Sequence, residues 1–191
     1  MENIIPINEL ETRMRPGAYS IGGFLGISES LEAVLRQDEL TLLNAGLTYE
    51  SLTKQVEEII DDALKQKHAM LFGNLQQLRE REKISIPWRK SNTVPIFSID
   101  NLPVTNIGFL VNNKYQVFFA QWRGFQDCPW NCKQPNWGSF DFLLLNRQTG
   151  EYIIAPGLIV HLIREHRFFE GRESPYRVDP FKLAQVLELV S

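Results

Sequence analysis

The hydrophobic pattern of this chain changes period twice, and the order of these periods limits the fold more than any other feature. Apolar residues recur at helical spacing up to about residue 82, short β-branched and aromatic runs follow from residue 105 to residue 155, and helical spacing then returns. Strands and helices do not alternate, so the pattern predicts an α+β fold with about four antiparallel strands. We expect one domain over residues 1–191.

The first part of the predicted domain is helical. Residues 1–27 contain proline and clustered glycines and are expected to be irregular, whereas residues 28–82 form the helical part. Within it, the spacing predicts a helix over residues 28–45, which Gly46 ends, and a second helix that starts near Thr48. Because the connection is short, we expect the two helices to pack antiparallel as an N-terminal helix hairpin.

The second part, residues 84–191, is expected to contain β-hairpins followed by two C-terminal helices. Residues 84–103 hold three prolines and are interpreted as a crossing segment. The predicted strands are residues 105–111 paired with 115–122, and residues 140–145 paired with 151–155. A helix is predicted from Pro156 to about Phe169, stopping at Gly171, and Asp179 is the expected N-cap of the last helix.

Two short pairs of cysteine and histidine give the strongest chemical signal. Cys128 and Cys132 are the only cysteines of the chain, and His161 and His166 are two of its three histidines. Thiolate and imidazole are the donors that zinc takes in tetrahedral sites, and both spacers fall within the ranges of zinc-binding pairs. The cysteines are expected on a loop and the histidines on the following helix. The pattern therefore predicts one zinc ion shared between a loop and a helix.

A second interpretation stays open, in which the cysteines are free thiols and the histidines are structural. The gap between the two pairs is 28 residues, far more than the dozen or so in a two-cysteine, two-histidine finger. Positions five apart on a helix point about 140° apart. His166 falls on the apolar face of its predicted helix, and Glu165 lies one turn after His161, where it could simply pair with it.

The number of ligands separates two possible functions of such a site. With all four ligands the metal is structural, whereas a catalytic zinc keeps an open position for water beside three protein ligands. Loss of Cys132 or His166 would leave that opening, and Asp127, Asp141 and Glu165 are nearby candidate bases. The alternative function is therefore a metal-dependent hydrolase with an incomplete, three-ligand site.

Charge and hydropathy argue against two classes of partner. The net charge is −3 and the isoelectric point is about 5.7, whereas a nucleic-acid surface usually requires a basic face. No run of 18 apolar residues is present, so no membrane-spanning helix is expected. The N-terminus carries Glu2 where a signal peptide would be basic, and a cytoplasmic location is expected.

Tryptophan gathers around the cysteines. Trp122, Trp130 and Trp137 lie within sixteen residues of one another. Aromatic faces beside basic residues can stack on bases or other ligands. Few positive charges lie nearby, so the pattern favours aromatic side chains that pin the loop to the core.

The stretches HLIREHRFFEG (residues 161–171) and SPYRVDP (residues 174–180) resemble the tail of a group of uncharacterised prokaryotic proteins. The resemblance implies a bacterial origin and no particular activity. The function that we expect is binding of another protein by a non-enzymatic α+β domain, with a structural zinc. The contact surface would be the aromatic loop 122–140 or the helix hairpin. The sequence leaves the partner and the oligomeric state open.

Overall fold

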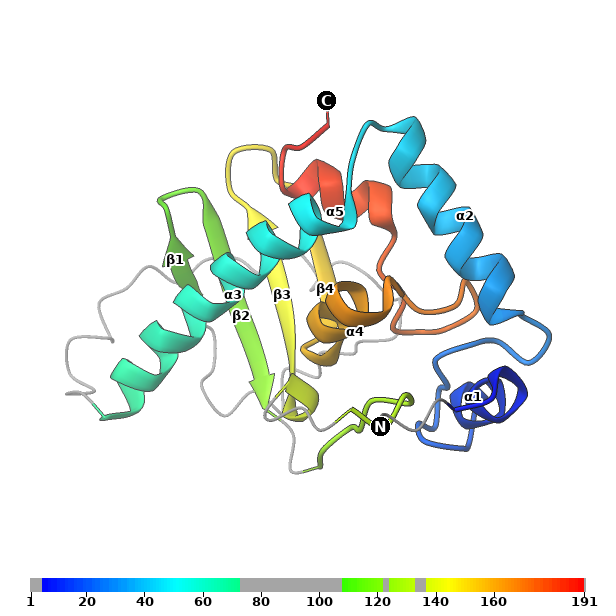
Figure 1. Cartoon of the computed structure of the whole chain (residues 1–191). Helices are drawn as coiled ribbons and strands as arrows, with labels where there is room; N and C mark the ends of the chain where they lie inside the picture. Colours follow the sequence, from blue (N-terminus) through cyan, green and yellow to red (C-terminus); the bar gives the residue numbers. More distant parts are fainter. Residues whose placement is uncertain (1–4, 73–107, 122–123, 133–136, 191) are drawn as a thin grey trace.

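The computed structural model describes residues 5–72, 108–121, 124–132 and 137–190, and over these residues it confirms the α+β class. The helices are α1 (Ile7–Met14), α2 (Leu31–Asn44), α3 (Tyr49–Phe72), α4 (Leu158–His166) and α5 (Pro180–Val186). The strands are β1 (Phe109–Val111), β2 (Tyr115–Gln121), β3 (Phe140–Asn146) and β4 (Tyr152–Pro156), with a short 3-10 helix, η4 (Trp137–Ser139), before β3. Figure 1 shows one sheet with α3, α4 and α5 in front of it and with α1 and α2 to one side. The predicted crossing segment 84–103 lies outside the described residues.

The sheet is a meander in the order β1-β2-β3-β4, and every neighbouring pair is antiparallel. Both predicted hairpins are confirmed. In the first, Asn112 and Asn113 adopt left-handed φ angles of 52° and 55°, and the Lys114 N–H donates to the Val111 carbonyl at 3.1 Å. Left-handed residues at both central positions match the right-handed twist of the strands, and asparagine tolerates them well.

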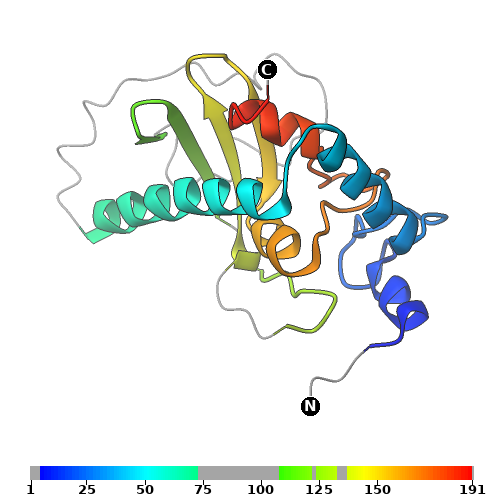
Figure 2. The ribbon, with the colours of Figure 1, turned by 45° about the horizontal axis from the view of Figure 1, so that its top comes forward.

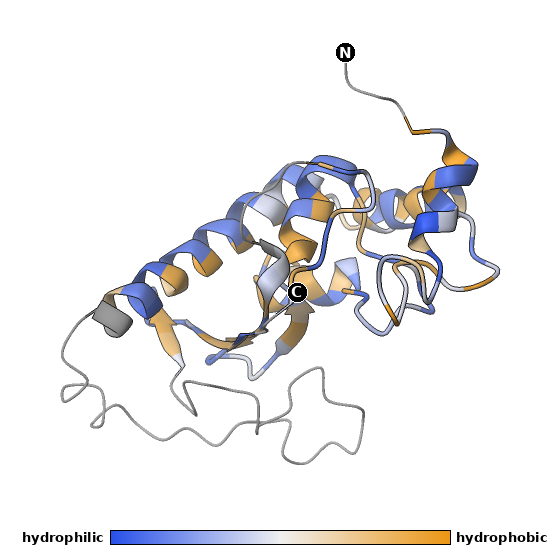
Figure 3. Ribbon diagram, turned by 90° about the horizontal axis from the view of Figure 1, so that it is seen from below, coloured by the Kyte–Doolittle hydropathy of each residue, from blue (hydrophilic) through white to orange (hydrophobic). Residues whose placement is uncertain are grey.

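Helices cover one face of this sheet, as Figures 1 and 2 show. α3 packs across β1 and β2, α5 packs on β3 and β4, and α4 packs between α3 and η4. In Figure 3 the apolar stripe of α3 faces the sheet and its polar stripe faces away, as expected for an amphipathic helix. Alternate residues of the two central strands meet these helices in the main core: Tyr115, Val117, Phe119, Phe140, Phe142 and Leu144.

The opposite face of the sheet is also apolar. Phe118 and Ala120 of β2 and Leu143 and Leu145 of β3 form a second buried cluster, with Tyr152 and Ile154 packed against it. A strand that is buried on both faces has no reason to alternate polar and apolar residues. This explains the almost continuous apolar runs in β2 and β3.

The prediction that residues 1–27 are irregular is wrong for part of this segment. Residues 7–14 form α1, which buries Leu10 and Met14 one turn apart. The chain then turns back, and the Phe24 and Leu25 N–H groups donate to the Met14 carbonyl at 2.7 and 3.0 Å. Two buried residues in eight make a weak periodic signal, which is why the pattern alone does not indicate this helix.

α2 and α3 are joined by a short loop, and Gly46 has the expected left-handed φ of 68°. The expectation that they lie antiparallel along each other is wrong: in Figure 1 they diverge, and α2 packs on α5 instead. The buried face of α2 includes Asp38, whose carboxylate accepts hydrogen bonds of 2.6 and 3.2 Å from Arg177. This ion pair draws α2 toward the C-terminal part of the chain.

α4 ends at His166, three residues before the predicted end. Arg167 takes a left-handed φ of 55°, and the Phe168 N–H closes the turn on the Leu162 carbonyl at 3.1 Å. Phe168 and Phe169 are both fully buried. The left-handed turn after α4 thus leads the chain directly back into the core.

α5 begins as the sequence predicts. The Asp179 carboxylate accepts from the Lys182 N–H at 2.9 Å, and Pro180 occupies the first turn. Within the described residues, no helix has both the length and the apolar character needed to cross a membrane.

Candidate metal centre

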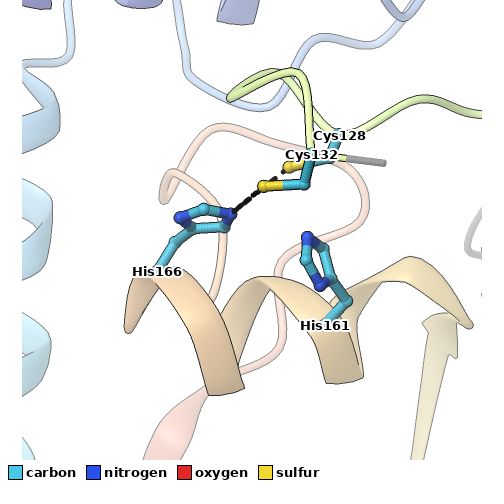
Figure 4. Close-up of side chains that lie close together, drawn as sticks. All are labelled: Cys128, Cys132, His161 and His166. Atoms are coloured by element: carbon cyan, nitrogen blue, oxygen red, sulfur yellow. Dashed lines mark hydrogen bonds between the residues drawn. The ribbon is translucent and has the colours of Figure 1, made fainter. Parts of the chain in front are cut away.

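The four predicted ligands come together at one place. Cys128 and Cys132 lie on the loop of residues 124–132, His161 lies in the middle of α4, and His166 is its last residue. Their donor atoms all lie within 4.8 Å of one another, so the cluster could hold a metal ion. Figure 4 shows both imidazole rings turned toward the sulfur atoms.

Two contacts hold the cysteine loop over α4. The Gln126 N–H donates to the Gly138 carbonyl at 2.9 Å, and η4, which contains Gly138, packs on α4. Glycine is required there, because a Cβ atom at this position would collide with the Gln126 carbonyl. The loop thus reaches α4 through a backbone contact that a larger residue would block.

Within the loop, the chain turns sharply between the two cysteines. The Asn131 N–H donates to the Cys128 carbonyl at 2.8 Å, and Asn131 has a left-handed φ of 62°. The turn brings both sulfur atoms to the same imidazole nitrogen. His166 Nε2 lies 3.4 Å from Cys128 Sγ and 3.2 Å from Cys132 Sγ.

Burial sets the protonation of the side chains in the cluster. It raises the pKa of Cys128 to about 12, although the Trp130 and Cys132 backbone N–H groups act in the opposite direction. It lowers the pKa of His166 to about 4, with a further contribution from His161, and it lowers the pKa of His161 as well. Both imidazoles are therefore neutral at pH 7 and have a lone pair to offer, whereas Cys128 must lose a proton to become a ligand.

His161 is the most unusual member of the cluster. It is 1% exposed, and neither ring nitrogen has a hydrogen-bond partner in the part of the chain that the structure describes. Burying an imidazole without partners costs free energy, since water would have satisfied both nitrogens. A metal bound to one nitrogen would remove part of that cost. The surroundings of the His161 ring therefore fit a metal ligand better than a hydrogen-bonded structural histidine.

Three expectations about the histidines are corrected. His161 is the fully buried one, and His166 is partly exposed. Glu165 accepts from Arg164 Nε at 2.7 Å, and no hydrogen bond joins it to His161 among the described residues. The 140° offset along the helix does not separate the two rings, whose centroids lie 5.2 Å apart. His166 ends the helix, and its ring turns back toward the loop.

Trp130 is a member of the site that ligand spacing does not identify. Its ring stacks on His166 with a centroid distance of 4.0 Å and an interplanar angle of 2°, and Phe168 contacts the ring edge-on at 5.5 Å. This confirms for Trp130 the prediction that tryptophan pins the loop to the core. Trp122 lies outside the described residues.

The candidate bases lie in different environments. Asp127 is exposed on the loop, and Asp141 is buried on β3, opposite Ala120 in the sheet. Glu165 is engaged by Arg164.

Comparison of the chain with protein-family models, with curated protein sequences and with solved structures gives no match.

Proposed function

We propose that this chain is a zinc protein in which Cys128, Cys132, His161 and His166 hold one ion as a structural centre. The observation that carries the proposal is the convergence of four sulfur and nitrogen donors from two separate segments within 4.8 Å. Soft thiolates together with imidazoles suit zinc better than magnesium or calcium, which prefer oxygen.

The distances support tetrahedral coordination. With Zn–S bonds of about 2.3 Å and Zn–N bonds of about 2.0 Å, neighbouring donors in a tetrahedron lie roughly 3.3 to 3.8 Å apart. The two sulfur–nitrogen distances at His166 are 3.2 and 3.4 Å. The widest separation, at most 4.8 Å, needs a side-chain movement of only about 1 Å to reach that range.

Four protein ligands favour a structural role over the hydrolase alternative. A tetrahedral zinc with four protein ligands has no position left for an activated water. What the ion would contribute is a link between the cysteine loop and α4, two segments separated by the β3–β4 hairpin. A loop without regular secondary structure gains most from such a link, because the ion replaces contacts that a small loop cannot make.

The zinc centre also gives the proposed protein-binding role a location. Phe125 lies on the same loop, three residues before Cys128, and is 52% exposed. An exposed aromatic ring on a fixed loop is a suitable contact for a protein partner. We therefore propose that the partner surface includes this loop.

Elemental analysis of protein purified without an affinity tag tests the zinc centre. We expect close to one zinc per chain in the wild type and none in the double variant Cys128→Ser/Cys132→Ser. The chain offers a matched control: His68, the third histidine, is exposed on α3, so His68→Ala should keep its zinc whereas His161→Ala should lose most of it.

Two outcomes contradict the proposal in different ways. Wild-type protein without metal, even after refolding with zinc, removes the centre altogether. Full zinc content in a variant of one of the four ligands shows that this side chain is not a ligand, and it favours the three-ligand hydrolase site.

A further inference from the structure

We infer that Trp130 is a positioning residue of the metal centre: its indole ring holds the His166 imidazole against the two sulfur atoms and slows release of the ion. The inference rests on the proposed function. It adds a role for a residue that has no ligand atom of its own.

His166 needs such support because of its place in the chain. It is the last residue of α4, and the next residue leaves the helix with a left-handed φ of 55°. No following helical turn is present to limit its side-chain rotation. His161, by contrast, sits in the middle of α4 and is 1% exposed, so packing fixes its ring. Of the two imidazoles, His166 is the one whose direction depends on a neighbour outside the helix.

Trp130 supplies that neighbour. The two rings are parallel within 2°, with centroids 4.0 Å apart, and in this arrangement His166 Nε2 points at both sulfur atoms, 3.2 and 3.4 Å away. Phe168 contacts the indole edge-on at 5.5 Å and is itself fully buried. The His166 imidazole therefore stacks on an indole ring that the buried Phe168 holds in place.

The position of Trp130 in the sequence links its indole ring to the two cysteine ligands. It lies midway between Cys128 and Cys132 on the same turn of the loop. When the loop packs on α4, it brings both thiols and the indole ring to the site together. One turn of chain thus provides two ligands and orients a third.

Stacking should be stronger in the metal-bound state than in the free state. A coordinated imidazole donates electron density to the cation and becomes electron-poor, whereas the face of an indole ring is electron-rich. The attraction between the two rings therefore increases when the ion binds. A contact that strengthens on binding slows dissociation, because it must be weakened before the ligand can leave.

The test is the rate at which zinc passes from the protein to a chromogenic chelator in excess, at pH 7.5. We expect Trp130→Leu to release zinc about tenfold faster than the wild type, the size of effect that supporting residues around a metal site commonly have. Trp130→Phe keeps an aromatic face and should restore most of the slow release. The matched control is Phe125→Leu, an exposed aromatic on the same loop, which should release zinc at the wild-type rate.

A spectroscopic readout separates positioning from a general loosening of the loop. Cobalt(II) in place of zinc reports the geometry of its ligands through its visible absorption bands. We expect Trp130→Leu to shift or weaken these bands, and Trp130→Phe and Phe125→Leu to leave them close to those of the wild type.

Each other outcome overturns the inference. Release rates that are the same in Trp130→Leu and the wild type show that the stack does not hold His166. If Phe125→Leu releases zinc as fast as Trp130→Leu, the loss of any apolar side chain from the loop has the same effect. Wild-type protein that takes up neither metal removes the centre itself, and this result alone also ends the proposed function.

Discussion

Removing zinc with a strong chelator is expected to lower the melting temperature of this protein by about 10 °C. An ion present at 1,000 times its dissociation constant stabilises the folded state by about 4 kcal/mol. The melting temperature of a domain of this size changes by roughly 2–4 °C per kcal/mol. The main core is formed mostly by the sheet with α3, α4 and α5, and the cysteine loop contributes Cys128 to it, with Trp130 and Cys132 packed against its edge. We therefore expect the metal-free protein to remain folded but less stable.

Thermal unfolding followed by circular dichroism, with and without chelator, measures this effect. The double variant Cys128→Ser/Cys132→Ser should melt near the temperature of the chelated wild type and should not respond to the chelator. His68→Ala, an exposed substitution far from the loop in sequence, should respond as the wild type does. Loaded and chelated wild type melting within about 2 °C of each other would show that the ion contributes less than 1 kcal/mol.

Replacing Glu170 with glutamine is expected to remove a loss of stability that the wild type shows between about pH 6.5 and pH 8. Glu170 is completely buried, and burial raises the pKa of its carboxyl from 4.5 to about 8 against the smaller lowering effects of Ser174 and Arg177. Its Oε2 lies 2.5 Å from Ser174 Oγ, which in turn lies 3.0 Å from the Gly23 carbonyl. A neutral carboxyl can donate to Ser174 while the hydroxyl donates to Gly23.

The sign follows from the two pKa values. Between 4.5 in the unfolded chain and about 8 in the folded protein, the folded state binds one more proton than the unfolded state, so raising the pH favours unfolding. One pH unit in this window costs about 1.4 kcal/mol while the proton difference is complete. Because that difference shrinks as the pH approaches 8, the loss from pH 6.5 to pH 8 is about 1.5 kcal/mol.

Urea unfolding at these two pH values tests the prediction. At pH 6.5 an unfolded histidine is about half protonated, whereas the pKa values of His161 and His166 are lowered in the folded protein, so these two rings favour folding as the pH rises and offset part of the wild-type loss. They do so equally in both glutamine variants, so the contribution of Glu170 is the difference between the variants. Glu173→Gln is the matched control, because this side chain is exposed three residues away. If Glu170→Gln loses as much stability as Glu173→Gln between the two pH values, Glu170 is not the buried acid that we describe.

Local patterns were sufficient to predict most of the sheet. The strands begin and end within about two residues of the predicted positions, among the residues described, because β-branched runs and the Asn112–Asn113 turn act over short distances. The course of α2 could not be predicted in this way. It follows from contacts with distant parts of the chain, which include the ion pair of Asp38 with Arg177, 139 residues along the chain. No local pattern indicates which distant residue will meet a buried carboxylate.

The four side chains of the candidate site were predicted from residue type and spacing, and their convergence was one of two interpretations that the sequence left open. The 28-residue spacer, whose length argued against a shared site, contains η4 and the β3–β4 hairpin. Because the two strands of a hairpin are antiparallel, the chain leaves β4 at the same end of the sheet at which it entered β3. The 140° offset between the histidines was overcome because α4 ends at His166. Phe168 and Phe169, which follow that end, are both fully buried in the core. Trp130 could be predicted to pin the loop, but not to stack on a ligand.

X-ray absorption at the zinc edge on the wild-type protein measures the number and type of ligands directly. The proposed structural centre predicts two sulfur atoms at about 2.3 Å and two imidazole nitrogens at about 2.0 Å, with no oxygen in the first coordination shell. A shell with one sulfur or one imidazole missing and an oxygen in its place would contradict the structural centre, and it would instead indicate a zinc with an open position for water.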